Sequence, residues 1–137
     1  MVNVLFNFPL IFKGLISLDE RLPPDVEEKV ARLQDLQEQL RLILVRKQQL
    51  QLQLAESQNA LEAIEKLSDD CEVYKAAGYV MFKSTKAKVL EELKDKRDTL
   101  ELRIKTLEKQ EALLRRQFEE LRREVNKLLS TIPRSGT

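Results

Sequence analysis

Residues 72–83 read EVYKAAGYVMFK, a short apolar segment inside an otherwise polar, leucine-rich sequence. Residues 72–75 and 79–83 favour β-strands, and Ala76-Ala77-Gly78 between them is typical of a short turn that contains glycine. The sequence therefore predicts a β-hairpin within residues 68–84.

The second predicted strand is apolar on both faces. Because side chains alternate between the two faces of a strand, the unbroken run from Tyr79 to Phe82 places apolar groups on each side. An isolated two-stranded hairpin is marginal in water, and its open edges invite further strands. We therefore predict that hairpins of several subunits pair into a larger sheet or a closed β-barrel platform. The residues expected to mediate this oligomerisation are Val73, Tyr74, Gly78, Tyr79, Val80, Met81 and Phe82.

Two long helical patterns flank the hairpin, with apolar residues at alternating spacings of three and four, as in a coiled coil. The patterns predict helices over residues 23–67 and 85–130, the second capped by Ser84 or Thr85. The segment that connects the two helices is too short for them to be independent domains. The expected fold class is therefore mainly α: a long antiparallel two-helix coiled coil with a single β-hairpin at its hinge. We call the following residues the seam positions: Val26, Lys29, Leu33, Leu36, Leu40, Ile43, Lys47, Leu50, Leu54, Ser57, Leu61 and Ile64, and Leu90, Leu93, Arg97, Leu100, Ile104, Leu107, Glu111, Leu114, Phe118, Leu121, Val125 and Leu128.

The helix ends most remote from the hairpin in sequence carry a second group of apolar residues. Terminal turns with few tertiary neighbours open easily, and helices that separate there expose an apolar groove. Exposed apolar patches mark interaction sites. The residues of this predicted site are Val26, Val30, Leu33, Leu36, Leu40, Phe118, Leu121, Val125, Leu128 and Leu129, with Ile132 beyond them.

Composition argues against catalysis. The chain has no histidine and one cysteine, so an imidazole base, a His-ligated metal and a thiolate zinc cluster are all excluded. It also lacks a glycine-rich phosphate loop, and Cys71 lies among acidic residues that do not activate a thiolate. We therefore predict that the chain is not an enzyme and takes no cofactor or metal.

Charge predicts neither a nucleic-acid nor a membrane partner. The net charge is +1, so the chain has no bulk field that attracts either polyanion. Glutamates interleave with the arginine pairs at 115–116 and 122–123, which leaves that stripe nearly balanced. Binding to RNA that weakens with salt would support the opposite interpretation.

The two ends of the sequence are predicted to lie outside the coiled coil. Residues 1–22 are apolar but interrupted, and they lack the basic start, continuous apolar block and cleavage site of a secretory signal. They represent either a poorly ordered tail or a start assigned too far upstream, and the sequence leaves both open. Residues 131–137, in which Pro133 and Gly136 end the helical pattern, are expected to form a disordered tail.

The order of these elements resembles the β class of archaeal prefoldin subunits. The resemblance is carried by Val73-Tyr74-Lys75, Gly78 and residues 80–83, followed by residues 84–93 and 100–104, and it covers roughly residues 22–130. One hairpin, where the α class of the family has two, indicates the β class. The resemblance implies a hexamer of two α and four β subunits, with coiled-coil arms on a double β-barrel platform.

The same resemblance implies an ATP-independent molecular chaperone in the cytoplasm. Such complexes capture unfolded polypeptides at the tips of the arms and transfer them to a group II chaperonin, so the remote apolar residues above become client-binding residues. A structural coiled-coil adaptor that links native protein partners remains the alternative. An adaptor ignores denatured proteins, whereas a chaperone prevents their aggregation.

Overall fold

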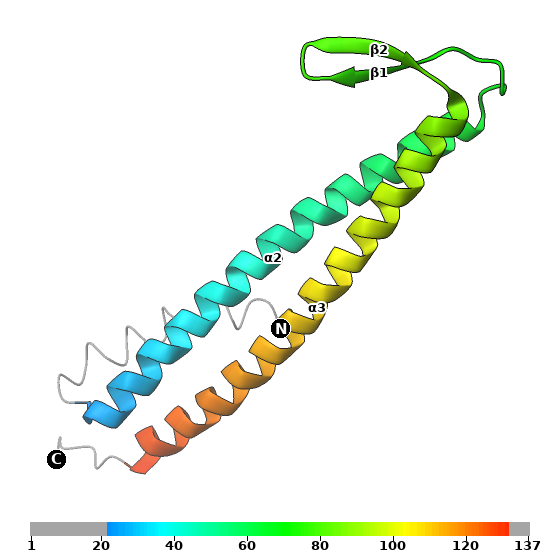
Figure 1. Cartoon of the computed structure of the whole chain (residues 1–137). Coiled ribbons are helices and arrows are strands. Elements are labelled where there is room, and N and C mark those ends of the chain that lie inside the picture. The colour runs from blue at the N-terminus through cyan, green and yellow to red at the C-terminus, as the bar shows by residue number, and fades with distance from the viewer. Residues whose placement is uncertain (1–21, 132–137) are drawn as a thin grey trace. The chain divides into compact units, whose positions relative to one another are not determined.

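The computed structural model describes residues 22–131 of the chain. It contains, in order, helix α2 (Pro24–Glu65), strands β1 (Val73–Ala77) and β2 (Val80–Ser84) and helix α3 (Lys86–Thr131) (Figure 1). The predicted fold class, two long helices joined by one hairpin, is confirmed. The predictions for residues 1–21 and 132–137, including Ile132, concern residues outside this range. Within the described range, neither α2 nor α3 has an apolar stretch long enough to cross a membrane.

Local interactions fix where each helix begins. At the start of α2, the amides of Val26 and Glu27 donate hydrogen bonds to the carbonyl of Pro23, at 3.0 and 3.1 Å. Pro24 occupies the first turn, where its missing N–H costs no helical hydrogen bond. At the start of α3, Oγ1 of Thr85 accepts a hydrogen bond of 3.2 Å from the amide of Lys88. Thr85 is therefore the residue that caps α3.

A lysine at the start of α3 caps the C-terminal end of α2. Nζ of Lys86 donates to the carbonyl of Leu67 at 2.7 Å and to the carbonyl of Glu65 at 3.4 Å. It also pairs with the carboxylate of Asp69 at 3.0 Å. The last carbonyls of a helix lack intrahelical partners and carry partial negative charge, so a cation is favoured there.

The chain divides into two compact units, and each contains part of both helices. We call residues 45–109 the hinge unit, and residues 22–44 with 110–131 the distal unit. Every seam position is buried or half-buried, which confirms the helical spacing read from the sequence. In the hinge unit, Leu50 packs with Leu100 and Ile104.

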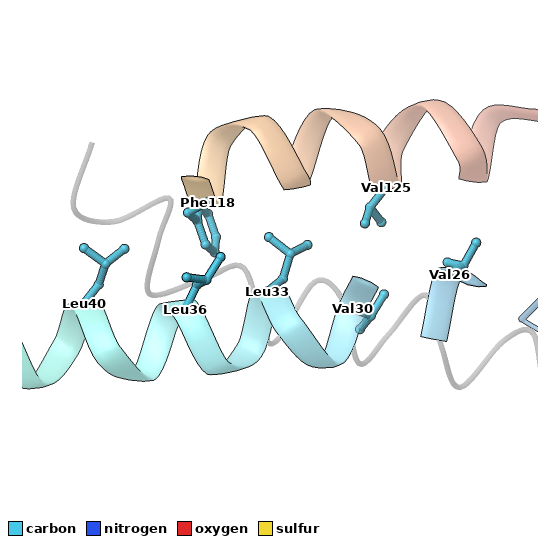
Figure 2. Packing of buried hydrophobic residues seen from close by; sticks show 7 residues of the cluster. All are labelled: Val26, Val30, Leu33, Leu36, Leu40, Phe118 and Val125. Atoms are coloured by element: carbon cyan, nitrogen blue, oxygen red, sulfur yellow. The ribbon is translucent and has the colours of Figure 1, made fainter. Parts of the chain in front are cut away.

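The distal unit has its own apolar core, which we call the tip core. It is formed by Val26, Val30, Leu33, Leu36 and Leu40 of α2 with Phe118 and Val125 of α3. Figure 2 shows the two α3 side chains pointing toward α2, with Phe118 beside Leu36 and Val125 nearer Val30. Residue numbers thus rise in opposite directions along the two helices, as an antiparallel pair requires.

The hairpin differs from the prediction at its turn. Strands β1 and β2 pair antiparallel from Val73 opposite Ser84 to Ala77 opposite Val80, so the loop consists of Gly78 and Tyr79 alone. The prediction of Ala76-Ala77-Gly78 as the turn was wrong, because both alanines belong to β1. Gly78 has a φ of 61°, and glycine at the first position of a two-residue loop matches the twist of the flanking strands.

Candidate functional site

Both faces of the hairpin present large apolar side chains to solvent. Val80 and Phe82 lie on one face, and Tyr74 and Met81 on the other. Val80 is 61% exposed and Met81 is 69% exposed, although such side chains are usually covered. With Tyr79 in the turn, these residues form what we call the hairpin surface. No other part of residues 22–131 covers this surface.

The other residues predicted for oligomerisation have different environments. Val73 is buried within the chain itself, so its part in assembly would be to support the strand rather than to contact a neighbour. Gly78 supplies the positive φ of the loop and has nothing near its Cα on the side where a Cβ would stand. The prediction therefore contains five residues that are open to a partner and two that shape the hairpin.

Ion pairs link the hairpin to its surroundings. Nζ of Lys75 on β1 pairs with the carboxylate of Glu92 on α3, a contact between two elements that the sequence pattern does not predict. Glu72 accepts hydrogen bonds from Nζ of Lys83 at 3.0 Å and from the hydroxyl of Tyr74 at 3.1 Å. Both hydrogen bonds lower the pKa of the Glu72 carboxyl, and the one from Lys83 has the larger effect. The pKa of Glu72 is thus lower in the folded chain than its ordinary value of 4.5. The two hydrogen bonds therefore stabilise the folded chain above about pH 4.5, and this contribution is lost as the pH falls further.

The tip core is closed. All seven of its side chains are buried, and Leu121, Leu128 and Leu129 pack against them while half-buried. The apolar groove expected between the helices is therefore filled by the side chains of the helices themselves. For the seven buried residues of the tip core to contact a ligand, α2 and α3 must separate in the distal unit.

A shallow hollow lies beside the tip core. It has a volume of about 350 Å³. Leu121 and Leu128 of α3 provide its apolar part, and the remaining lining residues are Asp25, Glu28, Lys29, Arg32 and Glu124. An ion pair of 3.2 Å joins Lys29 of α2 to Glu124 of α3 in this lining. The distal unit therefore has a small apolar patch with a charged rim even when its core is closed.

Two arginines of the stripe considered for nucleic acid are engaged in ion pairs along α3. Arg115 pairs with Glu111, and Arg122 pairs with Glu119, each at 2.9 Å. These pairs reduce the positive charge that the stripe offers to a phosphate.

We expect Phe118→Ala to destabilise the distal unit strongly. Phe118 is 1% exposed in the tip core, and removing a buried phenylalanine side chain typically costs about 3–5 kcal/mol. The matched control is Leu113→Ala on the same helix, where the side chain is 52% exposed and the cost should stay within about 0.5 kcal/mol. Hydrogen exchange of the α3 amides in the two variants measures the difference. Equal losses of protection would mean that Phe118 does not hold the unit together.

Together these features define a two-helix coiled-coil protein with an open apolar hairpin at its hinge. The family described as "Prefoldin subunit" matches residues 27–131. A prefoldin subunit beta of Archaeoglobus fulgidus is 42% identical over 115 residues, which cover 84% of this chain and 97% of the relative. A second, from Thermococcus onnurineus, is 41% identical over 110 residues, which cover 80% and 95%.

A solved structure agrees with these relatives. The crystal structure of the prefoldin beta subunit from Thermococcus strain KS-1 matches with a TM-score of 0.76 and 41% identity, and the match covers 82% of this chain and 98% of that one. The chain therefore belongs to the prefoldin family, as a chaperone subunit of the β class. The resemblance read from residues 73–83 and the flanking helices is confirmed.

Proposed function

We propose that the chain is one of four β subunits that assemble with two α subunits into a cytoplasmic hexamer. This hexamer captures unfolded polypeptides without ATP and transfers them to a group II chaperonin. Two observations within residues 22–131 carry the proposal: the hairpin surface is uncovered, and the tip core lies between α2 and α3. The hairpin surface needs neighbouring subunits, and the tip core can be opened to a client.

Assembly follows from the hairpin. Apolar side chains such as Val80 and Met81 on opposite faces can be covered together only if other chains lie on both sides of the sheet. The outer edges of β1 and β2 have no strand partner among the described residues, so further strands can add to them. Hairpins of neighbouring subunits then extend the sheet into a closed barrel.

Capture follows from the tip core. Unfolded proteins expose apolar side chains, and the tip core offers the same chemistry once its helices separate. Opening costs free energy, because Leu33, Phe118 and Val125 lose their partners, and a client that covers them restores part of that contact. Each single contact is therefore weak. Several arms acting on one client raise the overall affinity without sequence recognition.

Transfer follows from the same weakness. A client held by several weak contacts can leave one arm at a time, so a chaperonin can displace it without nucleotide hydrolysis on this complex. Charged side chains at the distal end, among them Arg116, Glu120 and Arg123, are exposed. They keep empty arms apart and provide a polar surface on which the chaperonin docks.

Aggregation of denatured clients tests the proposal. The complex with an α-class partner is mixed, without nucleotide, with several unrelated proteins diluted from denaturant, and light scattering is followed. A chaperone at a few-fold molar excess should suppress scattering of all of them. An adaptor for native partners would leave the scattering unchanged, which would contradict the proposal. Unassembled chain at equal mass is the control for a non-specific protein effect.

A further inference from the structure

The N-terminal segment of this chain is strongly apolar. Residues 2–12 read VNVLFNFPLIF and contain no charged residue. The family match begins only at residue 27, and 115 residues of this chain already cover 97% of the Archaeoglobus relative. The segment therefore lies outside the residues that the family model matches.

The chain leaves the described structure at the tip. Leu22, the first described residue, is half-buried and packs against the tip core that begins with Val26. Any segment that precedes Leu22 thus starts next to this core. Asp25, three residues after Leu22, lines the hollow together with Leu121 and Leu128. Continuity with this apolar contact therefore favours the hollow as a docking surface for the segment.

We propose that residues 2–12 dock on the distal unit of their own chain, over the hollow that contains Leu121 and Leu128, and compete there with clients. The competition rests on the proposed function, whereas the docking does not. The docked segment acts as a tethered substitute for an unfolded polypeptide, because it offers apolar side chains of the same kind.

The tether is long enough for this contact. Residues 13–21 span up to about 30 Å when extended, at roughly 3.3 Å per residue. Along α2, the tip core from Val26 to Leu40 extends only about 21 Å, at about 1.5 Å per residue. Residues 2–12 can therefore reach any part of the tip core from Leu22.

Tethering makes even a weak contact effective. A short flexible tether gives an effective concentration of about 1 mM, so an apolar contact with a dissociation constant near 0.1 mM would be occupied for roughly nine-tenths of the time. Only the remaining fraction of tips would be free, and the apparent affinity for a client would fall about tenfold. Clients held by several arms still displace the segments. The segment therefore raises the client concentration that is needed for binding and does not prevent binding.

Photo-crosslinking tests the docking without any client. Phe12 is replaced by p-benzoylphenylalanine in the full chain, the chain is assembled with its α-class partner, and crosslinked peptides are mapped by mass spectrometry. Mixing isotope-labelled and unlabelled chains separates contacts within a chain from contacts between chains. We expect crosslinks to residues 110–131 of the same chain. The same probe at Leu102, on the exposed side of α3 in the hinge unit, is the matched control and should not reach residues 1–21.

Deletion of residues 2–12 tests the competition. The client concentration for half-maximal binding to the assembled complex should fall about tenfold, and Phe6→Ser, Phe8→Ser and Phe12→Ser together should reproduce that fall. Asn3→Ser with Asn7→Ser keeps the apolar residues and should leave client binding unchanged. Equal client binding by full and deleted chains, without tip crosslinks, would overturn the inference and leave the chaperone function standing.

The remaining outcomes are also decisive. If neither the full nor the deleted complex binds clients but the crosslinks form, the proposed function fails and the docking stands. Crosslinks to a second chain would overturn the docking. It would also be overturned if the probe gave no crosslinks to residues 110–131 and if phosphatidylcholine vesicles bound the full complex but not the deleted one. A native protein whose N-terminus lies after residue 12 would overturn it as well.

Discussion

Val80→Asp is expected to convert the assembled complex into separate chains. In the chain alone Val80 is exposed on β2, so the charge should not disturb its folding. In the proposed barrel the same side chain is covered by neighbouring hairpins, where an unpaired charge costs several kcal/mol. Because all four β subunits of the proposed hexamer would carry the change, the penalty would repeat within each complex, and we expect no hexamer at micromolar concentration.

The opposite face of the hairpin provides a second arm of this experiment. Met81→Asp should have the same effect as Val80→Asp if both faces are covered in the assembly. Leu102→Asp is the matched control, since Leu102 is 67% exposed on α3 in the same unit but lies outside the hairpin. Sedimentation velocity with the α-class partner gives the masses, and circular dichroism checks that the helices persist. A hexamer with Val80→Asp would remove the hairpin from the interface.

The helices were predictable because their signal is repeated many times. Each turn of a coiled coil contributes another apolar residue to the same face, and a few exceptions such as Lys47 or Ser57 do not obscure the spacing. Ser57 is buried in the seam despite its hydroxyl. Boundaries were less certain: α2 ends at Glu65 rather than residue 67, since end residues take part in few of these repeats.

The details that the sequence did not predict depend on contacts between segments far apart in the chain. The ion pair of Lys75 with Glu92 and the contact of Lys86 with the end of α2 join residues on different elements, whereas the spacing rule for ion pairs considers only one helix. The turn was misplaced because alanine is a weak strand former, so Ala76 and Ala77 looked like loop. Pairing across the strands overrode that preference.

For the tip core, the sequence pattern predicts which residues are apolar but not whether they are packed or open to a ligand. Its residues were identified correctly as an apolar group, but the same spacing describes a packed core and a groove that two separated helices expose. The structure gives the packed state, with Leu33 and Val125 fully covered. Whether the group also binds clients depends on the free energy of opening, which a sequence pattern does not contain.

Removing the distal unit is expected to abolish client capture and to leave assembly intact. A chain of residues 45–109 keeps the hairpin surface, the packing of Leu50 with Leu100 and Ile104, and the contact of Lys86 with the end of α2. It loses the whole tip core. Since multivalent arms raise affinity by about 10²–10⁴, losing all of the β tips should weaken client binding at least about 100-fold.

The control for this truncation is a chain of residues 22–131, which lacks both sequence ends but keeps the tip core. Native mass spectrometry should give the same stoichiometry for both chains with the α-class partner, because both keep the hairpin. Light scattering of denatured clients should then be suppressed by the 22–131 complex and not by the 45–109 complex. Suppression by both would place capture on the hinge unit, where apolar side chains such as Leu52 and Leu102 are exposed, and would contradict the role proposed for the tip core.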